Sequence, residues 1–130
     1  GRLEIINYKN KKIILDGSHN IDGAEKLNEF LISKKIKPTV LFGMLNNKKA
    51  SLFFDKIKKR ISKVLAIKIP DEKNSFSTKQ INEICDSHSL KCKQINSINE
   101  ALKYFISNQE KIYLITGSLY LIGKIRRKLL

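Results

Sequence analysis

The stretch from Ile14 to Leu31, ILDGSHNIDGAEKLNEFL, decides how the rest of the chain is interpreted. It opens as an apolar strand, and from Asn20 onward its apolar residues recur at helical spacing. Between the strand and the helix lie an acid, a glycine, a histidine and an amide. A buried strand that passes through a glycine turn into an amphipathic helix is typical of an α/β fold. These polar side chains are therefore expected at the carboxyl end of a strand.

The same alternation continues along the chain. We expect strands at Leu3–Asn7, Lys12–Asp16, Pro38–Gly43, Lys63–Ile69, Leu90–Ile95 and Lys111–Thr116. We expect helices at Asn20–Lys34, Lys49–Ser62 (with Leu52, Phe53, Ile57 and Ile61 facing inward), Ser77–His88, Ser97–Asn108 and Ser118–Leu130. Continuously apolar strands such as VLF and IYLI indicate a parallel sheet that helices cover on both faces. The predicted fold is a single three-layer, doubly wound, Rossmann-like α/β domain over residues 1–130. Its mostly parallel sheet of about six strands would carry an antiparallel edge hairpin.

Composition excludes some classes of protein. With 130 residues, 42% of them apolar, the chain is long enough for one core. No apolar run approaches the roughly 18 residues that a membrane span needs, and no signal-peptide pattern opens the sequence. Cys85 and Cys92 lack the spacing of metal ligands, and we interpret them, with His88, as structural. No membrane partner is expected, and the reducing cytoplasm is the expected location.

The net charge of +14 raises the question of nucleic-acid binding. Of the 26 basic residues, 22 are lysines, which are scattered over the expected helices and loops with few aromatic residues between them. Only Lys124–Lys128 is a compact cluster, and the dipole at the end of a helix favours cations there. We therefore expect no nucleic acid among the partners, and a basic nucleic-acid-binding module stays open as a remote alternative.

Three glycine-containing segments follow expected strands: DGSHN, FGMLNNK and TGSLYLIG. The carboxyl ends of parallel strands share one edge of the sheet, and ligands bind there. Asp16 suits the hydroxyl groups of a ribose, and Lys48 suits an anion. The free N–H groups of the helix that starts at Ser118 suit a carboxylate or a phosphate. Taken singly, each segment also fits an ordinary turn or a helix cap such as Asn20.

Several nucleotide and catalytic motifs are absent from the sequence. It contains no G-x-x-x-x-G-K-[ST] phosphate loop, no G-x-G-x-x-G, no zinc-ligand spacing and no nucleophile elbow. If the chain handles a nucleotide, the main phosphate cradle lies elsewhere. The sequence also begins abruptly, with Gly1 and Arg2 directly before a strand. Both points suggest a piece of a longer enzyme.

Together GRLEI, ILDGSHNIDGAEKLNEFL, LFGMLNNKK and ITGSLYLIGKIR resemble, in order and spacing, the C-terminal domain of bacterial dihydrofolate synthase/folylpolyglutamate synthase. That family belongs to the Mur ligases, which are ATP-dependent amide ligases. The resemblance implies that L-glutamate is joined to dihydropteroate or to (poly)glutamylated folates through an acyl phosphate, with ATP and Mg²⁺. It also implies a partner: the enzyme's own N-terminal P-loop ATPase domain, which is absent from this chain and binds the magnesium. This chain alone is then expected to be inactive.

The resemblance implies roles for residues at matching positions. Arg2 would reach the ATP phosphates, and Asp16 would contact the nucleoside. His19 and Asn20 would lie near the phosphates and the reacting centre, with His19 as the catalytic residue. A guanidinium suits the phosphates because it is always charged and can donate to two oxygens at once.

Ser118 and Lys48 match positions expected near the incoming glutamate, and no residue of this chain is expected to bind the metal ion. The sequence departs from the family pattern at Ser18, where alanine is usual, and at Ile21, where proline is usual. The stretch Asn46–Lys49 replaces Ala-Asp-Lys-Asp, and this loss of two acids weakens the assignment of Lys48.

A ligase that adds amino acids to a cell-wall muramyl precursor is the alternative within the Mur ligases. The sequence also leaves open whether the folate activity is dihydrofolate synthesis, polyglutamylation or both.

Overall fold

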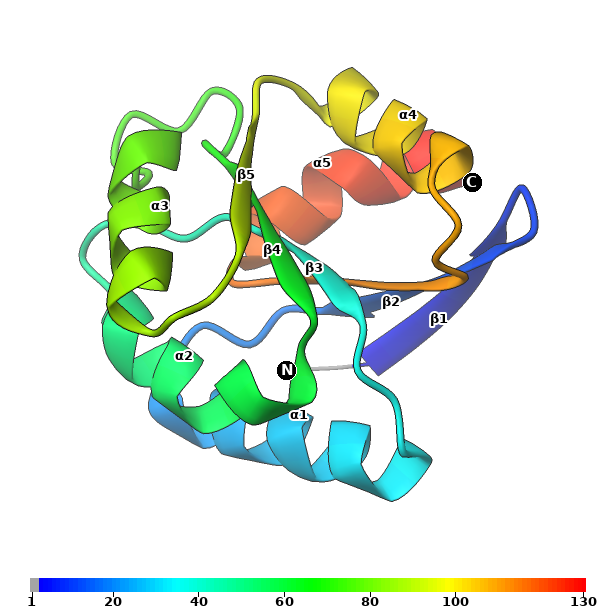
Figure 1. Cartoon of the computed structure of the whole chain (residues 1–130). Coiled ribbons are helices and arrows are strands. Elements are labelled where there is room, and N and C mark those ends of the chain that lie inside the picture. The colour runs from blue at the N-terminus through cyan, green and yellow to red at the C-terminus, as the bar shows by residue number, and fades with distance from the viewer. Residues whose placement is uncertain (1–2) are drawn as a thin grey trace.

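The computed structural model describes residues 3–130, which form a six-stranded sheet (Figure 1). The strands are β1 (Leu3–Tyr8), β2 (Lys11–Asp16), β3 (Thr39–Phe42), β4 (Lys63–Ile67), β5 (Cys92–Ile95) and β6 (Ile112–Thr116). Their order in space is β1-β2-β6-β3-β4-β5. β1 pairs antiparallel with β2, and all other neighbouring strands are parallel. The predicted mostly parallel sheet with an antiparallel edge hairpin is confirmed.

Helices cover both faces of this sheet. They are α1 (Ile21–Lys34), α2 (Ala50–Ile57) with the following 3-10 turn η1 (Lys58–Arg60), α3 (Thr78–Ser87), α4 (Ile98–Ser107) and α5 (Leu119–Leu129). α1, α2 and α3 lie on one face, and α4 and α5 lie on the other (Figure 1). The predicted three-layer arrangement is therefore confirmed. None of the helices in residues 3–130 is long and apolar enough to cross a membrane.

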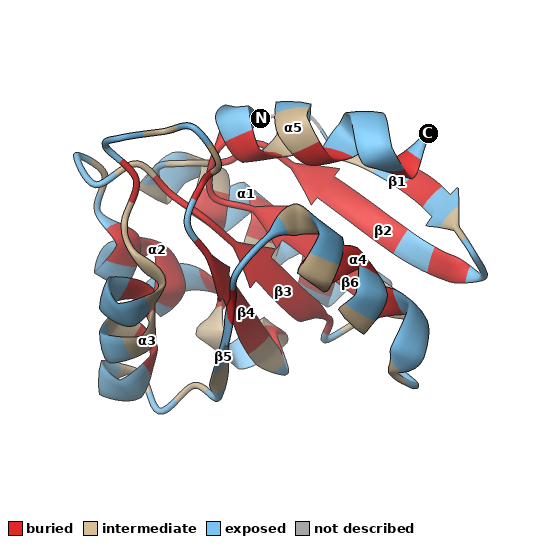
Figure 2. Cartoon of the chain, turned by 90° about the horizontal axis from the view of Figure 1, so that it is seen from above, coloured by how far each residue is buried: buried red, intermediate tan, exposed pale blue. Residues whose placement is uncertain are grey.

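Each face of the sheet has its own apolar core. Along β3, Val40 and Phe42 belong to the cluster beneath α1, α2 and α3, whereas Leu41 belongs to the cluster beneath α4 and α5. Along β6, Leu114 and Tyr113 divide between the two clusters in the same way. The strands are apolar without alternation because both of their faces are buried. Figure 2 shows the central strands buried and the outer surfaces of the helices exposed.

The helix predicted at Lys49–Ser62 is shorter than expected. α2 ends at Ile57, and η1 then leads toward β4. Leu52, expected to face inward, is 41% exposed, and Phe54 is fully buried instead. The other three residues predicted to face inward, Phe53, Ile57 and Ile61, are buried as expected. Phe54 is buried in addition because its ring packs against Phe42 with centroids 4.5 Å apart.

Arg126 of α5 ties the edge strand β1 to the rest of the molecule. Its Nε and Nη2 atoms donate to the two carboxylate oxygens of Glu4 at 2.9 and 3.0 Å. The hydrogen bond from Arg126 lowers the pKa of Glu4, and the same bond raises the pKa of Arg126. Because water reaches both groups, the pair contributes only a small, salt-sensitive stabilisation.

Cys85 of α3 and Cys92 of β5 are free thiols on neighbouring elements. Interaction with the Cys92 thiol and burial raise the pKa of Cys85. His88, directly after α3, lies with Nε2 2.9 Å from the Ser51 hydroxyl of α2. These contacts join neighbouring elements and agree with a structural interpretation of both cysteines and of His88.

Candidate functional site

Four parallel strands end level with one another. Asp16 of β2 lies beside Thr116 of β6, which lies beside Phe42 of β3. Phe42 in turn pairs with Ala66 of β4. The chain leaves β2 toward α1 on one face and leaves β6 toward α5 on the opposite face. Adjacent strands whose helices diverge leave a crevice between their loops, and open α/β sheets bind ligands at such points.

Asp16 joins the loops at this edge. It is only 3% exposed, and its Oδ2 atom accepts hydrogen bonds from the Thr116 hydroxyl at 3.1 Å and from the Ser18 N–H at 3.3 Å. The Gly117 N–H donates to the Ser18 carbonyl at 3.1 Å. The Gly43 N–H donates to the Thr116 carbonyl at 3.4 Å. The loops after β2, β6 and β3 thus form one hydrogen-bonded unit.

Two glycines allow these loops to approach one another. Gly117 has a φ of +112°, and a Cβ atom there would lie 2.3 Å from the Gly43 carbonyl oxygen. A Cβ atom at Gly17 would lie 2.3 Å from Cδ2 of Leu119. A side chain at Gly117 would push the loop after β6 away from the Gly43 backbone, and only glycine adopts the Gly117 conformation without strain. A side chain at Gly17 would instead displace the exposed side chain of Leu119.

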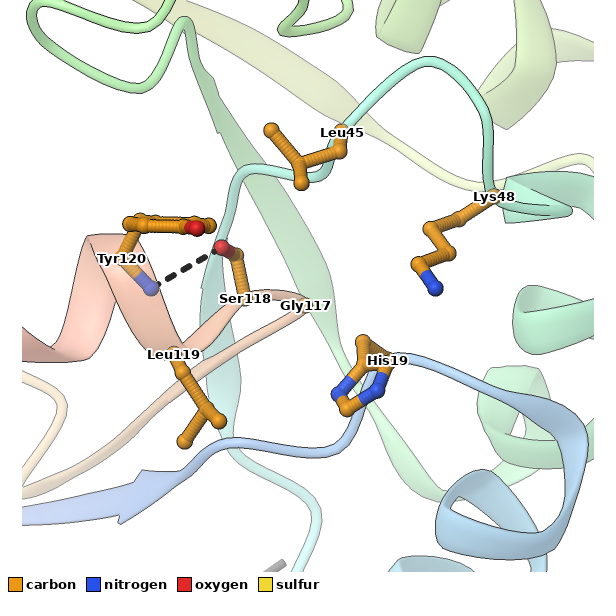
Figure 3. A pocket seen from close by; sticks show the side chains of 7 residues that line it. All are labelled: His19, Leu45, Lys48, Gly117, Ser118, Leu119 and Tyr120. Atoms are coloured by element: carbon orange, nitrogen blue, oxygen red, sulfur yellow. Dashed lines mark hydrogen bonds between the residues drawn. The ribbon is translucent and has the colours of Figure 1, made fainter.

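A pocket of about 170 Å³ opens between the three loops (Figure 3). It is lined by His19, Leu45, Lys48, Gly117, Ser118, Leu119 and Tyr120. In Figure 3 the Lys48 side chain extends toward His19 from the loop after β3. A second pocket shares His19 and Lys48 with the first and adds Asn20, Ile21, Asn47 and Lys49. The edge therefore brings an imidazole, an amine and a hydroxyl together.

A backbone contact sets the position of the proton on His19. Its Nδ1 atom lies 3.1 Å from the Gly17 carbonyl oxygen, which can only accept a hydrogen bond. The neutral ring therefore carries its proton on Nδ1 and keeps Nε2 as an acceptor. Such a nitrogen can receive a proton from an amine or a hydroxyl group bound nearby.

Helices α1 and α5 both begin at this edge, and each has a side-chain cap. The Asn20 amide oxygen accepts from the Gly23 N–H at 2.8 Å, and the Ser118 hydroxyl accepts from the Tyr120 N–H at 3.1 Å. The positive ends of the two helix dipoles and the Lys48 amine favour negative charge between them. The arrangement suits a ligand that carries a carboxylate or a phosphate.

Most of the predicted site residues meet at this edge. His19, Lys48 and Ser118 line the first pocket, and Asn20 lines the second. Asp16 lines neither, since it is the buried joint between the loops. The predicted phosphate contact, Arg2, lies outside the described residues. Among residues 3–130, no group of three His, Cys, Asp or Glu side chains is placed to hold a metal ion.

Sequence reasoning missed the apolar wall of the first pocket, which consists of Leu45, Leu119 and Tyr120. Leu119 and Tyr120 are 62% and 56% exposed, although they stand in the first turn of a helix that packs on the core. A Leu-Tyr pair directly after a serine cap is the feature that could have indicated this wall. Whether this pair lies in the core or at the surface depends on which face of α5 is buried, and the buried residues of α5 begin at Leu121.

Comparison with known proteins extends this description. Residues 2–128 match the family model described as dihydrofolate synthetase, C-terminal domain. The chain is 29% identical over 135 residues to the dihydrofolate synthase/folylpolyglutamate synthase of Bacillus subtilis (strain 168). That alignment covers 99% of this chain and 30% of the Bacillus protein.

Solved structures show the same fold. The folylpolyglutamate synthase of Thermotoga maritima aligns with a TM-score of 0.86 and 26% identity, over 99% of this chain and 30% of its own. The bifunctional folylpolyglutamate synthase/dihydrofolate synthase of Yersinia pestis, complexed with AMPPNP and a Mn ion, aligns with a TM-score of 0.80 and 18% identity. That alignment covers 95% of this chain and 30% of the Yersinia chain. The chain thus spans 30% of the length of each of these relatives.

Proposed function

Because this chain belongs to the family of dihydrofolate synthetase C-terminal domains, we propose that it forms the glutamate- and nucleotide-facing part of an ATP-dependent folate ligase. In the proposed reaction L-glutamate is joined to dihydropteroate or to a (poly)glutamylated folate, with ADP and phosphate as the other products. The observation that carries the proposal is that His19, Lys48 and Ser118 line one pocket whose remaining wall is apolar.

The first pocket suits the incoming glutamate. The Lys48 amine and the first turn of α5, capped by Ser118, offer positive charge and free N–H groups to a carboxylate. His19, with Nε2 as its acceptor, receives the proton that the glutamate amino group releases when the amide bond forms. The apolar wall keeps water away from the activated acyl group, which water would otherwise hydrolyse.

We assign the nucleotide contacts of this chain to the same edge. ATP supplies the phosphoryl group that activates the acid, and Arg2, His19 and Asn20 are the residues proposed to contact it. Since Oδ2 of Asp16 already accepts two hydrogen bonds, a contact to a ribose hydroxyl falls to its other oxygen. Mg²⁺ and the phosphate loop are assigned to an N-terminal ATPase domain. The complex of the Yersinia enzyme with AMPPNP and a Mn ion supports ATP and a divalent metal ion as ligands of the full-length enzyme.

Ligation by the full-length protein that contains this chain tests the proposal. ADP release should require both L-glutamate and a pterin or folate acid, and comparing dihydropteroate with a reduced folate separates the two folate activities. Lys48→Ala should raise the KM for glutamate at least about tenfold, because a hydrogen bond to a charged group contributes about 1.5–3 kcal/mol. Lys26→Ala, which removes an exposed lysine from α1, should change that KM by less than about twofold.

Two results would contradict the proposal in different ways. ADP release that depends on a muramyl substrate, and on no pterin or folate, would assign the chain to a cell-wall ligase. A Lys48→Ala enzyme with an unchanged KM for glutamate would agree with the proposed reaction but contradict the assignment of glutamate to this pocket.

A further inference from the structure

Segment 44–46, in the loop that carries Lys48, pairs with segment 74–76 in the loop between β4 and α3. The pairing is antiparallel, with a bridge between Leu45 and Ser75. Two backbone hydrogen bonds complete it: Asn46 N–H to Asn74 carbonyl at 2.7 Å, and Phe76 N–H to Met44 carbonyl at 2.9 Å. This contact between two loops is separate from the hydrogen bonds that connect the loops after β2, β6 and β3.

Lys48 is attached to this pairing by one tight turn. Its N–H donates to the Leu45 carbonyl at 3.1 Å. Leu45 and Lys48 both line the first pocket, whereas Ser75 does not. The place of the Lys48 amine therefore depends on where segment 74–76 holds Leu45.

The Ser75 hydroxyl fixes segment 74–76 to the end of β4. Ser75 is 6% exposed, and its Oγ atom accepts from the Ile69 N–H at 3.0 Å and donates to the Phe76 carbonyl at 2.9 Å. Ile69 is fully buried, so its N–H has no water to replace a lost partner. Because this hydroxyl connects the chain just after β4 to the paired segment, its removal should loosen the pairing without opening the core.

We propose that Ser75 is a positioning residue for the pocket. Through the pairing of segments 44–46 and 74–76, its hydroxyl holds Leu45 and Lys48 in place and so sets the affinity for the carboxylate ligand. The kinetic part of this proposal rests on the proposed function, and the structural part does not.

Amide hydrogen exchange of the 130-residue chain, followed by NMR, tests the structural part. In Ser75→Ala the buried Ile69 N–H loses its acceptor, and the pairing of segments 44–46 and 74–76 should loosen. The Asn46 and Phe76 amides should therefore exchange about tenfold faster. The Leu114 amide in β6 should keep its rate. Ser87→Ala is the matched control, since the Ser87 hydroxyl bonds only locally, to the Ile84 carbonyl at 2.7 Å. Unchanged exchange at Asn46 and Phe76 would overturn the proposal.

Steady-state kinetics of the full-length protein test the positioning role. Ser75→Ala should raise the KM for glutamate about three- to tenfold and leave the KM for ATP within about twofold. Ser75→Thr keeps the hydroxyl, so its exchange rates and its KM for glutamate should match those of the wild type. Faster exchange with an unchanged glutamate KM would overturn the role. A wild-type enzyme that does not use glutamate would instead defeat the proposed function, and the exchange rates would still decide whether Ser75 holds the pairing.

Discussion

Asp16 was predicted as a ligand contact, and in the structure its carboxylate also connects two loops. The sequence indicated an acid at the end of a strand, and its position there is confirmed. The hydrogen-bond partner of Asp16 could not be predicted from the sequence. Thr116 lies 100 residues away, and the segments after the other expected strands also contain polar groups. The contacts to Thr116 and Ser18 make Asp16 the joint of the candidate site.

This joint can be tested by stability. Asp16→Ala leaves the Thr116 hydroxyl and the Ser18 N–H without their acceptor, and we expect the free energy of unfolding to fall by about 1–3 kcal/mol. Asp16→Asn keeps one acceptor oxygen and should lose less. Glu29→Ala, on the exposed face of α1, should stay within about 0.5 kcal/mol of wild type. Urea denaturation measures all three, and wild-type stability in Asp16→Ala would show that the loops are held together by other contacts.

At the scale of helices and strands, prediction succeeded where side chains carry a pattern. The cap at Asn20 and the apolar face of α1 locate that helix, and the structure confirms both. At α2 the prediction was right for Phe53, Ile57 and Ile61 and wrong for Leu52 and for the end of the helix. Phe54 is buried instead of Leu52, because its ring contacts Phe42 of a distant strand. It also could not find the pairing of segments 44–46 and 74–76, because hydrogen bonds between backbone groups leave no trace in the side-chain sequence. His19, Lys48 and Ser118 were predictable because their positions at strand ends follow from topology alone.

Two glycines after β6 should respond in opposite ways to the same substitution. Gly117→Ala forces a Cβ atom to 2.3 Å from a backbone oxygen at a φ of +112°, so we expect a loss of at least about 2 kcal/mol in the free energy of unfolding. Gly123→Ala meets no atom within 4 Å and lies inside α5, where alanine is favoured by about 0.5–1 kcal/mol. Thermal unfolding of the two variants provides the comparison. A Gly117→Ala protein as stable as wild type would mean that the loops need not approach as closely as described.

For the molecule as a whole, the candidate site occupies only the carboxyl edge of the sheet. The sheet and helices of residues 3–130 bury an apolar core on each face, and the residues of both cores come from this chain. The net charge of +14 comes from lysines spread over the sequence, of which Lys48 is the one that lines both pockets at the edge. The positive charge is therefore spread over the whole sequence, whereas the candidate function depends on a few groups at one edge of the sheet.

That residues 1–130 form one self-sufficient domain stays a prediction, and it has a direct test. We expect the isolated chain to unfold in a single cooperative urea transition, because both faces of its sheet are covered by its own helices. We also expect no ADP release from ATP, dihydropteroate and L-glutamate, because the sequence contains no phosphate loop. The full-length protein, assayed at the same concentration, is the positive control. Turnover by the isolated chain would mean that its own edge, with the N-termini of α1 and α5, holds the ATP phosphates without a partner domain.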